Sequence, residues 1–238
     1  MSARDGAVSI APLATIDLTL RPYRWPFAQE RRAEIDAYFA AAQQAKPGLW
    51  NGRVLLFRHC AIDAGALRGA AFETDYASFL TWLAGDGVAD PAVRNCFSCA
   101  AVEGTDGGFL LGLMGPQTAN AGRIYFPCGT PDPADLVEGR VDLAGSAQRE
   151  LREETGLDAA GLTVEPGWMA VSDGPLLALF RRMRAPVPAE TLLAVGRAHL
   201  RREAYPELAD LMVVRERAQI DPAMPRFVAT YLDHVLPR

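Results

Sequence analysis

The chain has few cysteines and histidines and no long hydrophobic run. Four cysteines and three histidines are spread over 238 residues, and no apolar stretch approaches the roughly 20 residues needed to cross a membrane. The opening segment, MSARDGAVSIAPL, does not have the charged and then apolar pattern of a secretory signal. These absences predict a cytoplasmic protein with reduced thiols and no membrane partner.

The chain also has no excess of positive charge. Its formal net charge is −5, which argues against broad electrostatic binding to nucleic acid. A few arginines or a bound metal would still suffice for a small anionic substrate. Half of the residues are hydrophobic, enough for a sizeable buried core.

Periodicity predicts an α/β sandwich on a mixed sheet. We expect a main domain over residues 92–238 and an N-terminal α+β extension over residues 1–91. The predicted strands cover residues 15–23, 52–60, 95–104, 107–115, 122–129, 179–184 and 210–216. The predicted helices cover residues 28–45, 75–85, 142–155, 188–203 and 225–236.

The segment RELREETGL, residues 149–157, carries three glutamates within one and a half helical turns. At 100° per residue, Glu154 lies inside the apolar stripe that begins at Leu143, while Glu150 and Glu153 lie at its edge. One interpretation is a solvated helix end with ion pairs such as Arg149 with Glu153. The other is a divalent cation that compensates carboxylates held against the core.

This segment resembles the second half of a Nudix box, G-x5-E-x7-R-E-U-x-E-E-x-G-U, where U is apolar. All seven specified positions from Arg149 to Leu157 match. The first half departs from the pattern, since Asp135 stands at the glycine position and Val141 at the glutamate position. We expect Gly129 to begin the loop instead, with Glu138 partly replacing the missing acid.

The resemblance implies a Nudix-type α/β/α sandwich and a Mg²⁺-dependent hydrolase, with Mn²⁺ as an alternative cofactor. Glu150 and Glu154 would be the first metal ligands, and Glu153 a further or water-bridged ligand. Glu153 and Glu154 are also the catalytic candidates, together with Arg149, which would orient a glutamate. The general base would be a box glutamate or an acid on a later loop; the two loop candidates, Glu203 and Glu207, are more simply explained as surface charges.

The segment MGPQTANAGRIYFPCGTPDPADL resembles a Nudix subgroup that hydrolyses UDP-glucose and UDP-galactose. It implies a nucleotide sugar as substrate, with Arg123 and Gly129 as substrate-binding residues. The alternatives are an ADP-ribose or dinucleotide pyrophosphatase and a nucleotide-binding Nudix module without activity, which Val141 favours. The extension would either complete the substrate pocket or form a homodimer interface.

The remaining cysteines and aromatic residues have ordinary structural explanations. Cys96 and Cys99 are expected to be core thiols, because a strand directs them to opposite faces. Cys128 lies in the loop beside the proposed site. The aromatic residues considered for stacking on a base are Trp50, Tyr125 and Trp168.

Overall fold

The structure is a computed structural model that describes residues 7–237. The described part excludes residues 1–6 and residue 238. The expectation about a signal pattern falls partly on residues 1–6 and so lies partly outside the described residues. Within the described part, no helix is both long enough and apolar enough to span a bilayer.

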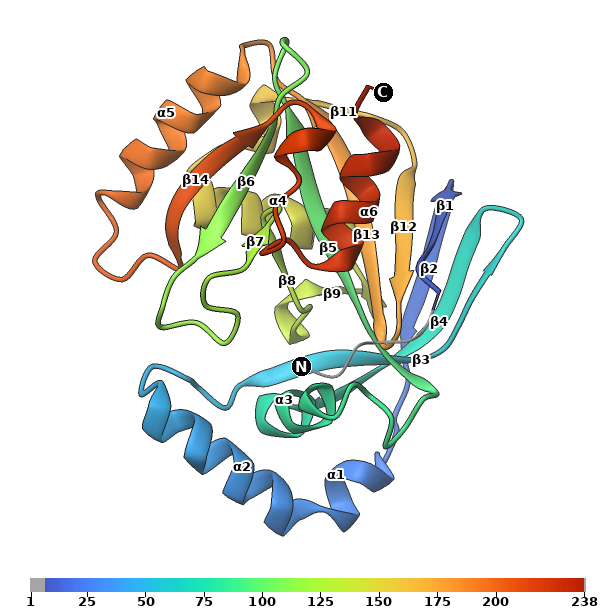
Figure 1. Cartoon of the computed structure of the whole chain (residues 1–238). Coiled ribbons are helices and arrows are strands. Elements are labelled where there is room, and N and C mark those ends of the chain that lie inside the picture. The colour runs from blue at the N-terminus through green and yellow to red at the C-terminus, as the bar shows by residue number, and fades with distance from the viewer. Residues whose placement is uncertain (1–6, 238) are drawn as a thin grey trace.

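A 14-stranded mixed sheet runs through the whole molecule (Figure 1). Its main path follows the order β1-β12-β13-β5-β3-β4-β2-β10-β9. The strands are β1 (Ser9–Leu13), β2 (Thr15–Leu20), β3 (Arg53–Asp63), β4 (Ala66–Asp75), β5 (Val93–Glu103), β6 (Phe109–Met114), β7 (Ile124–Tyr125), β8 (Cys128–Gly129), β9 (Leu136–Val137), β10 (Arg140–Val141), β11 (Thr163–Val164), β12 (Trp168–Asp173), β13 (Leu176–Arg184) and β14 (Leu208–Val214).

The centre of the sheet is buried on both faces. β5 runs parallel to β13, and β13 pairs antiparallel with β12. Ten of the eleven residues of β5 are buried, which explains why its sequence reads as a nearly continuous apolar run rather than an alternation. β6 joins β14 beside it.

Three helices cover the two faces of this central part (Figure 1). They are α4 (Leu143–Thr155), α5 (Ala189–Leu200) and α6 (Arg226–Val235). Ala100 and Val102 of β5 pack with α4 and α5, whereas Cys99 and Ala101 pack with α6. Since successive strand residues point to opposite faces, α6 lies on the face opposite α4 and α5.

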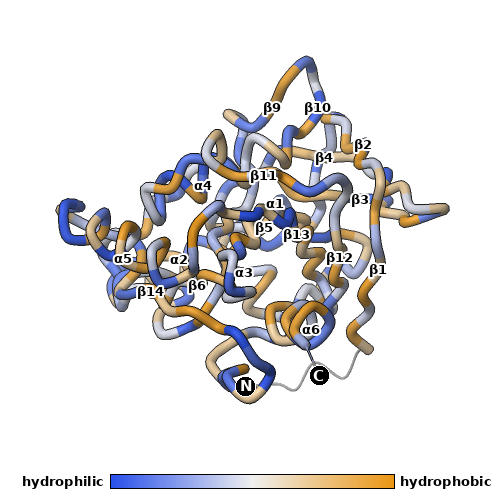
Figure 2. The backbone as a smooth tube through the Cα atoms, turned by 90° about the horizontal axis from the view of Figure 1, so that it is seen from above, coloured by the Kyte–Doolittle hydropathy of each residue, from blue (hydrophilic) through white to orange (hydrophobic). Residues whose placement is uncertain are grey.

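α6 shows how the amphipathic pattern sets this packing. Seen nearly end-on in Figure 2, it carries both hydrophobic and hydrophilic residues around its circumference. Phe227, Val228, Tyr231 and Leu232 are its buried residues, which repeat at the spacing of one helical face. The Tyr231 ring stacks on Phe180 of β13 with a centroid separation of 4.0 Å.

The N-terminal residues form a second layer beside the central part. Helices α1 (Pro26–Glu30), α2 (Arg32–Ala45) and α3 (Tyr76–Ala84) lie together below β3 in Figure 1. An aromatic core that includes Trp25, Phe72 and Trp82 holds them. β3 joins the central sheet where Phe57 and Arg58 pair with Arg94 and Val93.

The predicted α/β architecture on a mixed sheet is confirmed, and the helices near residues 76–84, 143–155, 189–200 and 226–235 are observed. The predicted helix 28–45 is divided at Arg31 into α1 and α2. The predicted strand 122–129 is two short strands, because Phe126 and Pro127 interrupt it. The boundary between the extension and the main domain at residues 91 and 92 stays a prediction. β1 of the extension pairs with β12 of the main domain, so one sheet includes strands from both.

Candidate functional site

Helix α4 carries the predicted carboxylates, and both of its ends are capped. The Asp142 side chain accepts a hydrogen bond from the Gly145 amide at 2.9 Å, which satisfies a free N–H of the first turn. Gly156 ends the helix at a φ of 69°, a conformation that glycine adopts without strain. A Cβ there would lie 2.8 Å from the His199 ring, so both backbone and packing require glycine.

The three glutamates of α4 lie in two different environments. Glu150 and Glu154 are buried, with exposures of 9% and 6%. They are four residues apart and therefore lie one above the other on one helical face. The Glu153 side chain is 55% exposed. The helix thus buries two of the carboxylates together and leaves the third at the surface.

Arg149 links these glutamates to a fourth acid, Asp135. Its guanidinium donates two hydrogen bonds to Asp135, at 3.0 and 3.2 Å. The other terminal nitrogen lies 2.9 Å from Glu150 Oε1 and 3.1 Å from Glu153 Oε2. Both hydrogen bonds to Asp135 come from one terminal nitrogen, and the other terminal nitrogen is held by the glutamates, so the guanidinium is fixed through both of its ends. Asp135 thereby helps to orient the arginine that contacts two box glutamates.

Asp135 is the residue of the candidate site that the sequence pattern missed. It occupies the position of the box glycine and is 6% exposed. Val141, at the position of the box glutamate, is instead part of a hydrophobic cluster with Leu143. Glu138 is exposed in a turn at a φ of 50°. The expectation that Glu138 partly replaces the missing acid is therefore corrected, because Asp135 makes the contact with Arg149.

Gly129 gives the Glu150 carboxylate the space in which it lies. A Cβ built on Gly129 would stand 2.3 Å from Glu150 Oε1, much closer than van der Waals contact allows. Gly129 belongs to β8, whose pairing with Ser98 of β5 fixes its position. The sheet thus presents a side-chain-free position to the carboxylate.

We expect Gly129→Ala to displace the Glu150 carboxylate and reduce metal-dependent activity at least about tenfold. Stability should change by less than about 1 kcal/mol, since the atom in the way is the end of a flexible side chain. Gly161→Ala is the matched control, because no atom lies within 4 Å of its added Cβ. Activity assays and thermal unfolding of both variants would measure the two effects. Unchanged activity in Gly129→Ala would contradict this account of the glycine.

Burial sets the protonation of the two inward-facing carboxyl groups. It raises the pKa of Glu150 to about 7, although the nearby Arg149 charge opposes the shift. Burial also raises the pKa of Glu154 well above its usual value, with further contributions from Cys128, Glu150 and Glu207. For both carboxyl groups, the cost of burying the negative charge exceeds what the neighbouring groups offset. Such carboxyl groups are typical of sites that take up a cation or a proton.

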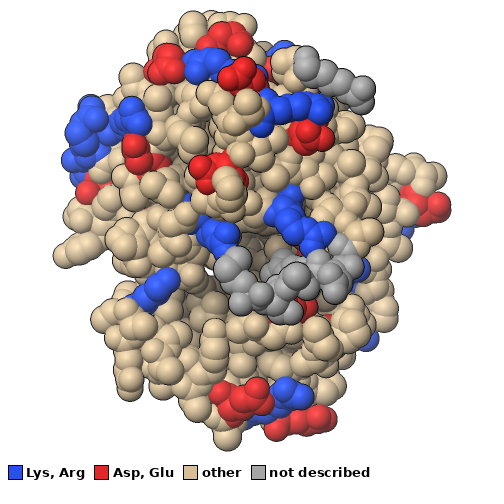
Figure 3. Space-filling view, viewed as in Figure 1, with Lys and Arg blue, Asp and Glu red and all other residues tan. Residues whose placement is uncertain are grey.

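A cavity of about 260 Å³ opens beside these carboxylates. Cys128, Gly129 and Glu207 line it on the side of α4, and Tyr76 and Phe79 of α3 line it on the N-terminal side. Figure 3 shows a hollow in this face of the molecule, with Lys and Arg side chains on its rim. The N-terminal layer thus supplies part of the wall.

One loop of the cavity is attached to the N-terminal layer. Ala119 and Asn120 line the cavity, and they belong to the loop between β6 and β7. The ammonium group of Lys46, at the end of α2, donates to the backbone carbonyls of Thr118 and Ala119. This contact holds the loop against the extension.

The structure separates the two acidic loop candidates. Glu207 lines the cavity, where partial desolvation and the Glu153 charge raise its pKa. Glu203 is exposed, and its carboxylate lies 3.8 Å from Nε2 of His199. The interpretation as an exposed surface charge therefore fits Glu203 but not Glu207. A sequence alone does not reveal this difference, because both acids lie in the same short loop.

The other residues predicted to contact the substrate do not all lie at this cavity. Tyr125 lines the cavity, whereas neither Arg123 nor Trp50 is among its described lining residues, and Trp50 is 80% exposed. Trp168 lies under the Arg181 guanidinium at 4.9 Å, in another part of the sheet. A substrate contact of Arg123 stays a prediction.

The predicted thiols behave as core groups. Cys96 and Cys99 are fully buried on opposite faces of β5, as their spacing indicated. Cys128 faces Cys99 across the β5–β8 pair. A hydrogen bond with Cys99 and burial raise its pKa well above the usual value, so the thiol is protonated and a poor nucleophile.

The donor set fits a hard divalent cation. Oxygen donors from Glu150 and Glu154 are buried together, and the Arg149 guanidinium pairs with Glu150, Glu153 and Asp135. Among residues 7–237, no three acidic, histidine or cysteine side chains already converge as a metal cage; Arg149 contacts the carboxylates of Glu150 and Glu153. The fit therefore rests on donor chemistry and excess negative charge.

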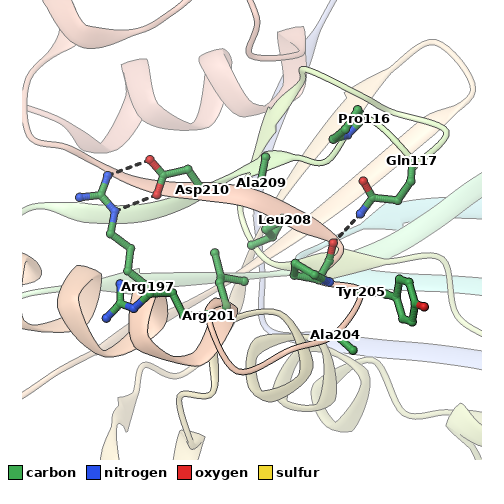
Figure 4. A pocket seen from close by; sticks show the side chains of 11 residues that line it. Pro116, Gln117, Arg197, Arg201, Ala204, Tyr205, Leu208, Ala209 and Asp210 are labelled. Carbon is green, nitrogen blue, oxygen red and sulfur yellow. Dashed lines mark hydrogen bonds and ion pairs between the residues drawn. The ribbon is translucent and has the colours of Figure 1, made fainter.

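A larger cavity of about 520 Å³ is lined by residues of α5, of the loop that follows it and of β14 (Figure 4). Its charged lining residues are Arg197, Arg201 and Asp210, and Arg197 donates to both oxygens of Asp210 at 2.8 and 2.9 Å. Pro116, Tyr205 and Leu208 supply apolar surface. The α4 glutamates line neither cavity, but Gly129 and Cys128, which line the smaller one, lie against Glu150 and Glu154 respectively. We therefore place the candidate active site in the smaller cavity.

No protein-family model matches the chain, and no curated protein matches it. Among solved structures, it is similar to a Nudix hydrolase from M. smegmatis, with 19% identity, a TM-score of 0.38, and coverage of 59% of this chain and 83% of that one. It is also similar to a MutT protein from Methanosarcina mazei Go1, with 17% identity, a TM-score of 0.40, and coverage of 60% and 92%.

A third similar structure, from Deinococcus radiodurans, has 12% identity and a TM-score of 0.44, and the match covers 78% of this chain and 99% of that one. All of these identities lie below 25% and all of the TM-scores below 0.5. What the chain does is therefore argued from its own residues.

Proposed function

We propose that this protein is a Nudix-type hydrolase that cleaves the pyrophosphate bond of a nucleoside diphosphate derivative with the help of Mg²⁺ or Mn²⁺. The observation that carries the proposal is the pair Glu150 and Glu154, buried one turn apart on α4 behind Gly129 and Cys128, which line a cavity. The complete motif from Arg149 to Leu157 supports the same activity.

Glu150 and Glu154 would hold the cation, with Glu153 as a further ligand. When bound, the cation would neutralise charge on the phosphate oxygens and favour an activated water. Arg149 positions Glu150 and Glu153 and is itself fixed by Asp135. Gly129 leaves room for the Glu150 carboxylate itself.

In the reaction, the oxygen of a water attacks one phosphorus and the bond from that phosphorus to the bridging oxygen breaks. The products are a nucleoside monophosphate and a second phosphate ester. The proton of the water passes to a carboxylate. A box glutamate or Glu207, which lines the cavity, would accept it, since a raised carboxyl pKa favours proton uptake.

The proposed substrate is a nucleotide sugar such as UDP-glucose, and the rival is ADP-ribose or a dinucleotide. A non-catalytic binding module was favoured by Val141 at the box glutamate position. Asp135 weakens that alternative, because it supplies the buried acid that contacts Arg149. We further propose that the protein acts in the cytoplasm on small nucleotides and binds neither nucleic acid nor membranes. Of the two roles of the extension, Tyr76 and Phe79 in the cavity wall support completion of the substrate pocket, and a homodimer interface is the alternative.

The test is the release of nucleoside monophosphate from UDP-glucose, UDP-galactose, ADP-ribose, NADH and diadenosine polyphosphates, with Mg²⁺ and with EDTA. We expect turnover with Mg²⁺, fastest on UDP-sugars, and none with EDTA. Faster turnover of ADP-ribose than of the UDP-sugars would instead assign the protein to the ADP-ribose or dinucleotide pyrophosphatases. Absence of turnover on every compound would refute the hydrolase and leave a binding module.

A further inference from the structure

The cavity beside α4 has a second, polar end whose chemistry the hydrolysis of a pyrophosphate does not use. Asn95 of β5 and Thr130 after β8 both line it. Asn95 is only 4% exposed, and its amide nitrogen lies 3.2 Å from the Thr130 hydroxyl. A buried amide with so few partners in a cavity calls for a ligand.

The hydrogen-bonding capacity of Asn95 is only half used. A side-chain amide offers two N–H donors and two carbonyl lone pairs. Thr130 accounts for one donor and one lone pair, at 3.2 and 3.4 Å. Among the described residues no other partner of this side chain is found. One N–H and one lone pair, held side by side, remain for a ligand.

Aromatic rings border the same cavity on two sides. Tyr76 and Phe79 of α3 contact each other with ring centroids 5.8 Å apart. On the side of the sheet and α6, Phe227 contacts Phe97 at 5.4 Å and Tyr125 at 5.8 Å. A flat ring between such walls buries both of its faces, whereas a hexose would bring several hydroxyl groups against apolar surface.

The distance from this end to the carboxylates suits one nucleotide. Gly129, which touches Glu150, pairs with Ser98. Asn95 lies three residues earlier on the same strand and contacts Thr130, the neighbour of Gly129, so its amide lies within about 10 Å of Gly129. Its side chain projects to the α6 face of β5, opposite α4, and the cavity that both Asn95 and Gly129 line connects the two. A phosphate beside Gly129 and Glu150 would therefore place the base of the same nucleotide near Asn95.

From these observations we infer that Asn95, oriented by Thr130, recognises the amide-like edge of a nucleobase held between the aromatic side chains of α3 and those of β5, β7 and α6. The inference rests on the proposed function for the orientation of the phosphate, and it adds that the base, rather than the sugar or other group, determines specificity. Adenine and uracil both present a donor beside an acceptor that complements a side-chain amide.

The experiment compares binding of adenosine, uridine and ribose in the presence of EDTA by ligand-detected NMR titration. Wild-type protein should bind at least one nucleoside at least about tenfold more tightly than ribose. Asn95→Leu, which has a similar volume, should weaken nucleoside binding at least about tenfold, because the edge of the base loses its partners. Asn120→Leu, at another lining residue, is the comparison variant and should have a smaller effect.

Equal binding of nucleosides and ribose by the wild-type protein would overturn the inference, even where Asn95→Leu does not fold. So would a folded Asn95→Leu variant that retains full nucleoside binding. Because the nucleosides carry no phosphate and no metal is present, these outcomes are independent of hydrolysis. Nucleoside binding without turnover on the substrate panel would refute only the hydrolase; turnover without base recognition would refute only the role of Asn95.

Discussion

Replacing Glu154 with glutamine is expected to lower Mg²⁺-dependent hydrolysis by at least about a hundredfold, since a metal ligand contributes several kcal/mol to the stabilisation of the transition state. The substitution conserves shape, and the buried group it removes has a raised pKa, so the fold should be retained. Hydrolysis of the best substrate from the panel, measured over a range of Mg²⁺ concentrations, would show the loss.

Glu138→Gln is the matched control for this variant. Glu138 lies in the loop before α4, but it is exposed and separate from the Arg149 cluster. Its removal changes the same formal charge and should leave activity within about twofold. If Glu154→Gln and Glu138→Gln had equal activities, the assignment of α4 as the metal-binding helix would be refuted.

A Glu150→Gln variant is expected to be more stable than the wild-type protein at pH 8 when both are free of metal. In the folded protein the pKa of Glu150 is about 7, above the usual 4.5. The folded state therefore holds this proton more tightly than the unfolded state does. Its stabilising contribution is complete below pH 4.5 and is lost as the pH rises to 7. For this one group the loss between pH 5 and pH 8 is roughly 2–3 kcal/mol.

Thermal unfolding in EDTA at pH 5 and pH 8 would measure this effect. The glutamine variant lacks the titration, so its unfolding temperature relative to wild type should rise by several degrees between pH 5 and pH 8. Glu138→Gln again serves as the control and should follow the wild-type curve. A constant difference between Glu150→Gln and wild type at both pH values would contradict the burial of an ionisable Glu150.

Local sequence was sufficient for the helix that carries the site. Asp142 and Gly156 mark the two ends of α4, and the 3.6-residue period placed Glu154 inside the buried stripe. The opposite-facing thiols Cys96 and Cys99 followed in the same way. These features depend on residues within a few positions of each other, so the spacing alone determines them.

Strands were predicted less completely, for a physical reason. β4 contains the segment ALRGAA, whose small residues give little alternation, and it was not predicted. β1 and β12 were missed as well. Their pairing joins residues more than 150 positions apart, and the energy of such a pair comes from partners that a local window does not contain.

The sequence by itself determined which carboxylates α4 carries and which of its faces they occupy. Only the tertiary structure decided what meets them. It brought Asp135 to Arg149, placed the backbone of Gly129 against Glu150, and separated Glu207 from Glu203. It also set α3 of the extension opposite Asn95. These contacts join segments that are distant in the chain, and they arise from how the sheet and the helices pack, which no spacing within one segment encodes.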